Sequence, residues 1–207
     1  MFKQLLPSKK KTGICIIACA VFKSAMEQLH LRELYPDVRI SYIQTNLHME
    51  PQKLKTSILR RIAAAKKKNE EVICLFGDCF PDINAICQRH GIKKVPGHHC
   101  YEMLLGSKHF NQLVEETAGT YFLEKDLILG FEELCMQPLE LYDKEIKNAL
   151  FEHYQKLVYV RQPADSDLKH KAGELARFLG LSLDIENADY KHLKRELTKL
   201  LRRKHTD

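Results

Sequence analysis

The sequence lacks several features by which protein function is commonly recognised. It contains no tryptophan, and no window offers the ~18 uninterrupted apolar residues of a membrane span, so we expect a soluble protein. It has no C-x-x-C pair, no G-x-x-x-x-G-K-[ST] and no H-E-x-x-H, which argues against zinc ribbons, thioredoxins, P-loop proteins and metalloproteases. No arginine closely follows Cys79 or Cys100, as the phosphate loop of a cysteine phosphatase would require.

Residues 1–13 do not have the pattern of a secretory signal peptide. The apolar stretch in residues 1–13 is too short for a signal peptide, and its lysines follow the stretch rather than precede it. We therefore expect a cytoplasmic protein. In that compartment the seven cysteines are interpreted as thiols, metal ligands or redox groups and not as a disulfide framework.

The chain is basic, with a formal net charge of +6. Much of this charge lies in three runs, at 9–11, 64–71 and 200–205. Nucleic-acid binding would require such charge interleaved with exposed aromatic residues, and these runs contain almost none. We interpret them as solvated surface and expect neither a nucleic-acid nor a membrane partner.

The pattern of apolar residues predicts alternating strands and helices. The continuous apolar run at 13–19 is typical of a strand buried on both faces of a parallel sheet, and residues 20–35 have helical spacing. Further strands are predicted at 37–48, 70–79 and 92–96, and further helices at 50–70 and 81–91. The alternation indicates βαβ units and an α/β fold. We expect a doubly wound, mostly parallel sheet with helices on both faces, Rossmann-like without the dinucleotide fingerprint.

The second half of the chain is organised differently. Residues 101–154 are mainly helical in pattern, interrupted by "AGTYFLEKD", and residues 155–207 follow a β-α-β-α pattern. We expect a single α/β domain over 1–207 with a helical insertion at 101–154. The C-terminal part either extends the same sheet or forms a second small lobe, and the sequence leaves both alternatives open.

Three cysteines and a histidine follow the predicted strands. Cys19 closes the first strand, His48 follows the second, Cys79 lies just beyond the third and Cys100 follows the fourth. Because the carboxyl ends of parallel strands meet at one edge of a sheet, these four side chains are expected to converge in one crevice. The sequence therefore predicts a metal site with Cys19, Cys79, Cys100 and His48 as candidate ligands.

Each of these cysteines also precedes or opens a predicted helix. Helix N-terminal amides stabilise a thiolate, so we expect lowered thiol pKa values. Gly77 and Gly97, close before Cys79 and Cys100, either allow the backbone to approach a ligand or are simple turn residues. The remaining cysteines are interpreted as core residues: Cys15, Cys74, Cys87 and Cys135.

Four further residues are candidates for ligand support or substrate binding. His98 and His99 compete with His48 as donors, and spacing does not rank them. Asp78 is either a partner that orients a ligand or a helix cap. Tyr121, with Tyr101 and Phe122, would line the crevice or belong to the core.

Five segments, in order, resemble a known family: "ACAVFKSAMEQL", "NLHMEPQKL", "LFGDC", "VPGHHCYEMLLGS" and "AGTYFLEKDL". They resemble the landmarks of the family known as domain of unknown function 1638. The resemblance implies a small prokaryotic cytoplasmic protein, of a kind often encoded beside corrinoid-dependent methyltransferases. It matches the family cysteines to Cys19, Cys79 and Cys100 and the family histidine to His48. Where the family pattern has an aspartate, glycines and a tryptophan, this chain has other residues, which indicates a divergent member.

From these features we predict a metal-dependent protein whose three thiolates hold zinc or an iron–sulfur cluster, acting in one-carbon, methyl or sulfur transfer. Soft thiolates suit both metals, so the sequence does not choose between them. The alternative is a non-catalytic accessory or cofactor-binding protein that partners a corrinoid methyltransferase system. A third reading is a metal-free cysteine enzyme with His48 or His99 as base. A small molecule or a corrinoid protein is the expected partner.

Overall fold

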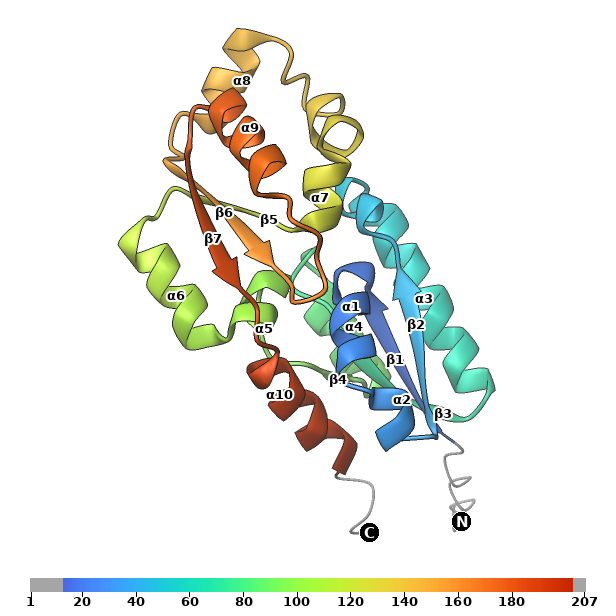
Figure 1. The fold of residues 1–207 in the computed structure, drawn as a ribbon. Coiled ribbons are helices and arrows are strands. Elements are labelled where there is room, and N and C mark those ends of the chain that lie inside the picture. The colour runs from blue at the N-terminus through green and yellow to red at the C-terminus, as the bar shows by residue number, and fades with distance from the viewer. Residues whose placement is uncertain (1–12, 203–207) are drawn as a thin grey trace, which may run out of the picture.

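Residues 13–202, described by a computed structural model, form an α/β fold with two sheets (Figure 1). The first sheet has the order β2-β1-β3-β4, with β1 (Gly13–Cys19), β2 (Val38–Ile43), β3 (Glu70–Leu75) and β4 (Lys93–Lys94). The second has the order β5-β6-β7, with β5 (Thr120–Leu123), β6 (Lys156–Arg161) and β7 (Ser182–Asn187). All neighbouring strands are parallel. The predicted α/β class and Rossmann-like parallel arrangement are confirmed.

Helices connect the strands throughout the described chain. They are α1 (Lys23–Gln28), α2 (Leu31–Leu34), α3 (Pro51–Lys67), α4 (Ile83–His90), α5 (Cys100–Leu105), α6 (Ser107–Glu116), α7 (Lys125–Leu129), α8 (Lys144–Phe151), α9 (Lys169–Leu179) and α10 (Lys191–Arg202). Three further short elements are the 3-10 helices η1 (Ala20–Phe22) and η2 (Thr45–Met49) and the π-helix η3 (Glu132–Met136). Among the helices between residues 13 and 202, none combines the length and apolar character that a membrane crossing requires. The basic run at 9–11 and the end of the run at 200–205 lie outside the described residues.

Local sequence explains the main elements. All seven residues of β1 are buried, because strands and helices cover it on every side, and this is why its sequence is continuously apolar. Helix α3 begins at Pro51, where a missing N–H costs nothing, and buries one face through Leu54, Ile58 and Ile62. Helix α4 ends at Gly91, whose φ of 63° places it in the left-handed region that glycine adopts without strain.

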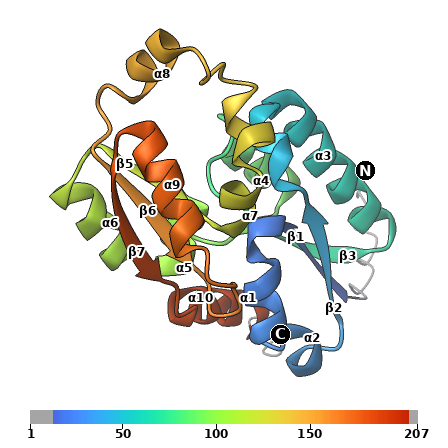
Figure 2. The same cartoon turned by 45° about the horizontal axis from the view of Figure 1, so that its top comes forward.

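The chain reverses direction across the first sheet. It runs outward from β1 to β2, then returns across β1 to β3 and continues to β4. Because such crossovers are right-handed, the helix that follows β1 lies on the opposite face of the sheet from the helices that follow β2 and β3. Figure 2 shows α1 on one side with α3 and α4 on the other. The point of reversal lies between β1 and β3. Open α/β sheets bind ligands outside the carboxyl ends of the strands at this point.

The C-terminal part forms its own three-stranded sheet with β5 and does not extend the first sheet. The halves share one hydrophobic cluster, since Val158 and Val160 of β6 and Leu193 of α10 are buried with the residues of β1 and β3. A buried glutamine also connects the two halves, because Gln162 Nε2 donates a hydrogen bond to the carbonyl of Val21 at 3.1 Å. Tyr190 holds that glutamine by donating to its Oε1 at 2.8 Å. The second sheet is thereby held beside the carboxyl edge of the first.

Candidate functional site

A cavity of about 400 Å³ lies at the carboxyl edge of the first sheet, next to the point of chain reversal. The segments that follow β1, β2, β3 and β4 form one wall, and β5, α7 and η3 of the second half form the other. The cavity is lined by Cys19, Val21, Thr45, His48, Met49, Asp78, Cys79, His98, His99, Cys100, Tyr101, Tyr121, Glu124, Leu127 and Cys135. All eight residues singled out in the sequence as site candidates are among them.

Two loops of the first sheet are pressed together at the cavity. The backbone N–H of Asp78 donates to the carbonyl of His98 at 2.6 Å, which joins the segment after β3 to the segment after β4. This approach requires Gly77, because a Cβ there would lie 2.7 Å from the His98 carbonyl oxygen. Gly77 therefore admits a neighbouring loop and not a ligand, and it brings Cys79 against Cys100.

His48 is oriented by the backbone of its own turn. Its Nδ1 donates to the carbonyl of Thr45 at 2.7 Å, and a carbonyl only accepts, so Nδ1 carries the hydrogen. Nε2 is left to face the thiols, with the Sγ of Cys19 at 3.9 Å. Burial lowers the pKa of His48. Hydrogen bonding with the Cys79 thiol and with the Thr45 carbonyl outweighs burial, so the pKa of His48 is raised.

The three thiols line the same cavity, and neighbouring thiols affect the pKa values of Cys79 and Cys100. The Cys100 thiol, followed by burial, raises the pKa of Cys79, and the Cys19 thiol, with burial, raises that of Cys100. The prediction that helix N-termini lower these pKa values is wrong. Helix α5 is only six residues long and α4 begins four residues after Cys79, so burial and the neighbouring thiols dominate.

The predicted metal-dependent function is not supported by the donor arrangement. Within residues 13–202, no group of three or more His, Cys, Asp or Glu side chains is arranged to hold a metal ion. The prediction of a three-cysteine zinc or iron–sulfur protein is therefore wrong.

The candidates at the cavity rim differ in their contacts. Asp78 Oδ2 accepts from Nδ1 of His98 at 2.7 Å, so Asp78 orients an imidazole and does not cap a helix. His99 packs its ring against Phe110, with ring centroids 5.5 Å apart. The hydroxyl oxygen of Tyr121 lies 3.9 Å from the Sγ of Cys135. Burial raises the pKa of Tyr121, so this hydroxyl stays protonated.

The other four cysteines are buried, as the sequence predicts. Cys15, Cys74 and Cys87 are buried in the core and do not line the cavity. Cys135 is also buried but lines the cavity from η3, and nothing in its local sequence signals this. Its position depends on how the second half of the chain packs on the first.

Glu124 is a site residue that the sequence analysis missed. It directly follows β5, a strand of the second sheet within the region predicted as mainly helical, so the rule that led to Cys79 and Cys100 did not reach it. Its carboxylate accepts from the backbone N–H groups of Asp126 at 2.8 Å and Leu127 at 3.0 Å, at the start of α7. Burial outweighs these bonds and raises the pKa of Glu124 to about 7.

The buried carboxyl of Glu124 gives stability a defined pH dependence. Its pKa rises from an ordinary value near 4.5, so between about 4.5 and 7 the folded protein holds a proton that the unfolded chain has released. The free energy of unfolding therefore falls as pH rises through this window. We expect Glu124→Gln to flatten the dependence by up to about 3 kcal/mol, measured by urea unfolding at pH 5 and pH 8. Equal slopes for the two proteins would contradict this assignment.

The fold and the cavity together define a Rossmann-like α/β protein with a thiol-lined cavity at the carboxyl edge of its first sheet. The particular family is the one described as Protein of unknown function (DUF1638), whose model matches residues 42–197. Since the match covers most of the chain, the protein belongs to this family. His48, Cys79, Cys100 and Glu124 lie inside the matched segment, and Cys19 precedes it.

Neither the curated proteins nor the solved structures gave a match to this chain. The family description assigns no reaction, cofactor or partner. The one-carbon function and the corrinoid-associated accessory role therefore have no support from the comparisons.

Proposed function

We propose that this protein is a cysteine-dependent oxidoreductase that reduces the disulfide bond of a small, mainly apolar molecule bound in the cavity. The observation that carries the proposal is that Cys79 and Cys100 line one cavity on two loops joined by the Asp78–His98 backbone hydrogen bond, with His48 lining the same cavity and facing its thiols. A single nucleophile would need only one of these thiols. A second thiol in the same cavity supports dithiol chemistry, because it can resolve a mixed disulfide formed on the first.

Cys79 is the thiol best placed to attack. It is partly exposed to the cavity, whereas Cys19 is only 1% exposed. His48 Nε2 takes the proton of Cys79, and the resulting thiolate attacks one sulfur of the substrate disulfide R–S–S–R. The S–S bond breaks, one R–S⁻ leaves and takes up a proton, and a mixed disulfide remains on Cys79.

Cys100 completes the reaction in the same cavity. Cys100 gives up its proton and its sulfur attacks the Cys79 sulfur of the mixed disulfide. The second R–S⁻ leaves and takes up a proton, and a Cys79–Cys100 disulfide remains. Two electrons thereby pass from the protein to the substrate. The raised thiol pKa values favour this direction, because the reduced form gains little stability as thiolate. A dithiol reductant restores the thiols, which fits a reducing compartment such as the cytoplasm.

The substrate class follows from the lining. Val21, Met49 and Leu127 contribute apolar surface, and no lysine or arginine lines the cavity within the described residues. At about 400 Å³ the cavity has the size of a small-molecule site. These features support a small disulfide with uncharged, largely apolar substituents.

The test uses the full chain, purified without oxygen and reduced. We expect incubation with bis(2-hydroxyethyl) disulfide to release two equivalents of 2-mercaptoethanol per chain. The protein should lose two hydrogens in mass, and digestion should yield a peptide pair joined through Cys79 and Cys100. Release of no thiol would overturn the proposal. Stoichiometric zinc or iron that holds the thiols and blocks the reaction would overturn it as well.

A further inference from the structure

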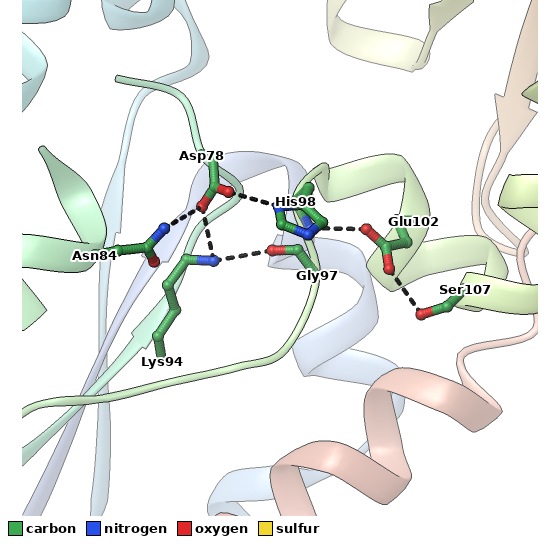
Figure 3. A network of polar contacts seen from close by, with 7 residues as sticks. All are labelled: Asp78, Asn84, Lys94, Gly97, His98, Glu102 and Ser107. Atoms are coloured by element: carbon green, nitrogen blue, oxygen red, sulfur yellow. Dashed lines mark hydrogen bonds and ion pairs between the residues drawn. The ribbon is translucent and has the colours of Figure 1, made fainter. Parts of the chain in front are cut away.

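A carboxylate and an imidazole form a pair at the rim of the cavity (Figure 3). Asp78 Oδ2 accepts from Nδ1 of His98 at 2.7 Å, so Nδ1 carries the hydrogen. The imidazole side chain is 80% exposed, and no described residue forms a hydrogen bond to its Nε2. Asp78 and His98 both line the cavity that contains Cys79 and Cys100. The pair therefore presents an accessible proton-exchanging nitrogen beside the thiols.

The carboxylate of this pair is fixed from the side opposite His98. Its Oδ1 contacts Lys94 Nζ at 3.0 Å and accepts from Asn84 Nδ2 at 3.3 Å. Lys94 also donates to the carbonyl of Gly97 at 2.9 Å, and so ties the segment before His98 to the same charge. These bonds to the charged form hold the pKa of Asp78 below its usual range even though burial raises it. Asp78 stays ionised and can orient an imidazolium.

The backbone of His98 is fixed as well. Its N–H donates to Glu102 Oε2 at 2.7 Å, a carboxylate that reaches back over the start of α5. Ser107 holds the other oxygen of Glu102, with its hydroxyl donating at 2.7 Å. The charged groups around His98 are thus Asp78, Lys94 and Glu102. A histidine needed only as solvated surface would not require support at both its ring and its backbone.

From this geometry we infer that His98 is a second acid–base residue of the site and donates a proton to the departing thiolate, with Asp78 as its positioning residue. The inference rests on the proposed disulfide reduction. His48 lies on the opposite segment and takes the proton of Cys79, so a separate group has to protonate R–S⁻ as the S–S bond breaks. The proton moves from Nε2 of the His98 imidazolium to the leaving sulfur, and solvent at the rim restores it.

Two disulfide probes separate this role from a structural one. Bis(2-hydroxyethyl) disulfide releases a basic alkanethiolate, whereas 4,4′-dithiodipyridine releases a group that leaves as a stable thione without an acid. We expect His98→Gln to slow reduction of the first probe about 100-fold, the lower end of general acid catalysis, and to leave the second near the wild-type rate. Asp78→Asn should slow the first probe less. It should also leave the 4,4′-dithiodipyridine rate near the wild-type value, because the imidazole loses its orientation while the thiols are unchanged.

A matched control is available elsewhere on the surface. His109 Nε2 bonds to Glu186 Oε2 at 2.7 Å, and this similar pair does not line the cavity. His109→Gln should therefore leave both rates unchanged. If His98→Gln slowed both probes equally, or neither, His98 would not be the acid. If the wild-type protein reduced neither probe, the proposed function itself would fail, and the inference with it.

Discussion

Replacing Cys100 by serine is expected to stop the reaction at its halfway point. The Cys79 thiolate should still attack bis(2-hydroxyethyl) disulfide with help from His48, but the second sulfur that would resolve the product is absent. One equivalent of 2-mercaptoethanol per chain should then be released in place of two. The other half of the probe should remain attached to Cys79. Intact-mass analysis and peptide mapping measure both quantities.

Two further variants, Cys79→Ser and Cys87→Ala, distinguish the attacking thiol from the resolving thiol and from an uninvolved one. Cys79→Ser should abolish thiol release, because the attacking thiol is removed, Cys19 is buried and Cys100 is assigned only the resolving step. Cys87→Ala is the matched control: Cys87 pairs with Cys74 outside the cavity, so two equivalents should still be released. Cross-linking that persists undiminished in Cys100→Ser would show that another thiol resolves the mixed disulfide and would refute the assigned role of Cys100.

Gly77→Ala is expected to separate the two reactive thiols without changing either. The added Cβ would lie 2.7 Å from the His98 carbonyl oxygen and 3.1 Å from the backbone nitrogen of Cys100. Backbone atoms cannot rotate away as a side chain would, so the segment after β4 has to move. We expect the Cys79–Cys100 disulfide to form at least about tenfold more slowly, with a loss of about 1–3 kcal/mol in the free energy of unfolding.

Gly173→Ala controls for the chemical change itself. Gly173 lies in α9, and a Cβ there would meet only Leu183 Cδ2 at 3.9 Å, an ordinary contact. Alanine favours a helix over glycine, so this variant should gain up to about 1 kcal/mol and keep the wild-type rate of disulfide formation. Mass spectrometry after timed quenching measures the rates, and urea unfolding measures the stabilities. A wild-type rate in Gly77→Ala would show that loop contact does not set the thiol geometry.

The sequence was sufficient to place most elements of the first half. The apolar run at 13–19 corresponds to β1, and Pro51 and Gly91 mark the start of α3 and the end of α4. These signals are local, since an uninterrupted apolar strand and a helix boundary depend on residues close in the chain. Residues close in the chain do not specify which sheet the C-terminal strands join. Whether β6 and β7 join the first sheet depends on pairing with β5, which no pattern within either strand specifies.

The chemistry of the cysteines was harder to predict than their position. A parallel sheet brings the ends of its strands to one edge, so Cys79 and Cys100 could be placed together from strand order alone. How closely their loops approach could not be predicted, because this depends on the contact between the two loops at Gly77. The same limit explains the wrong prediction of a metal site. Residue type and position identified possible donors, but not whether they point to a common centre.

By itself, then, the sequence determined the parallel α/β class and the edge at which polar and sulfur side chains gather, because both follow from short-range periodicity and the parallel direction of the strands. Only the tertiary structure decided how closely the thiol-bearing loops approach, that Asp78 orients His98, and that Glu124 and Cys135 complete the cavity. The first two features arise where loops of the first sheet meet at Gly77, and the third arises where the second sheet packs beside the first. They depend on contacts between residues far apart in the chain, whose distances and burial no local pattern contains.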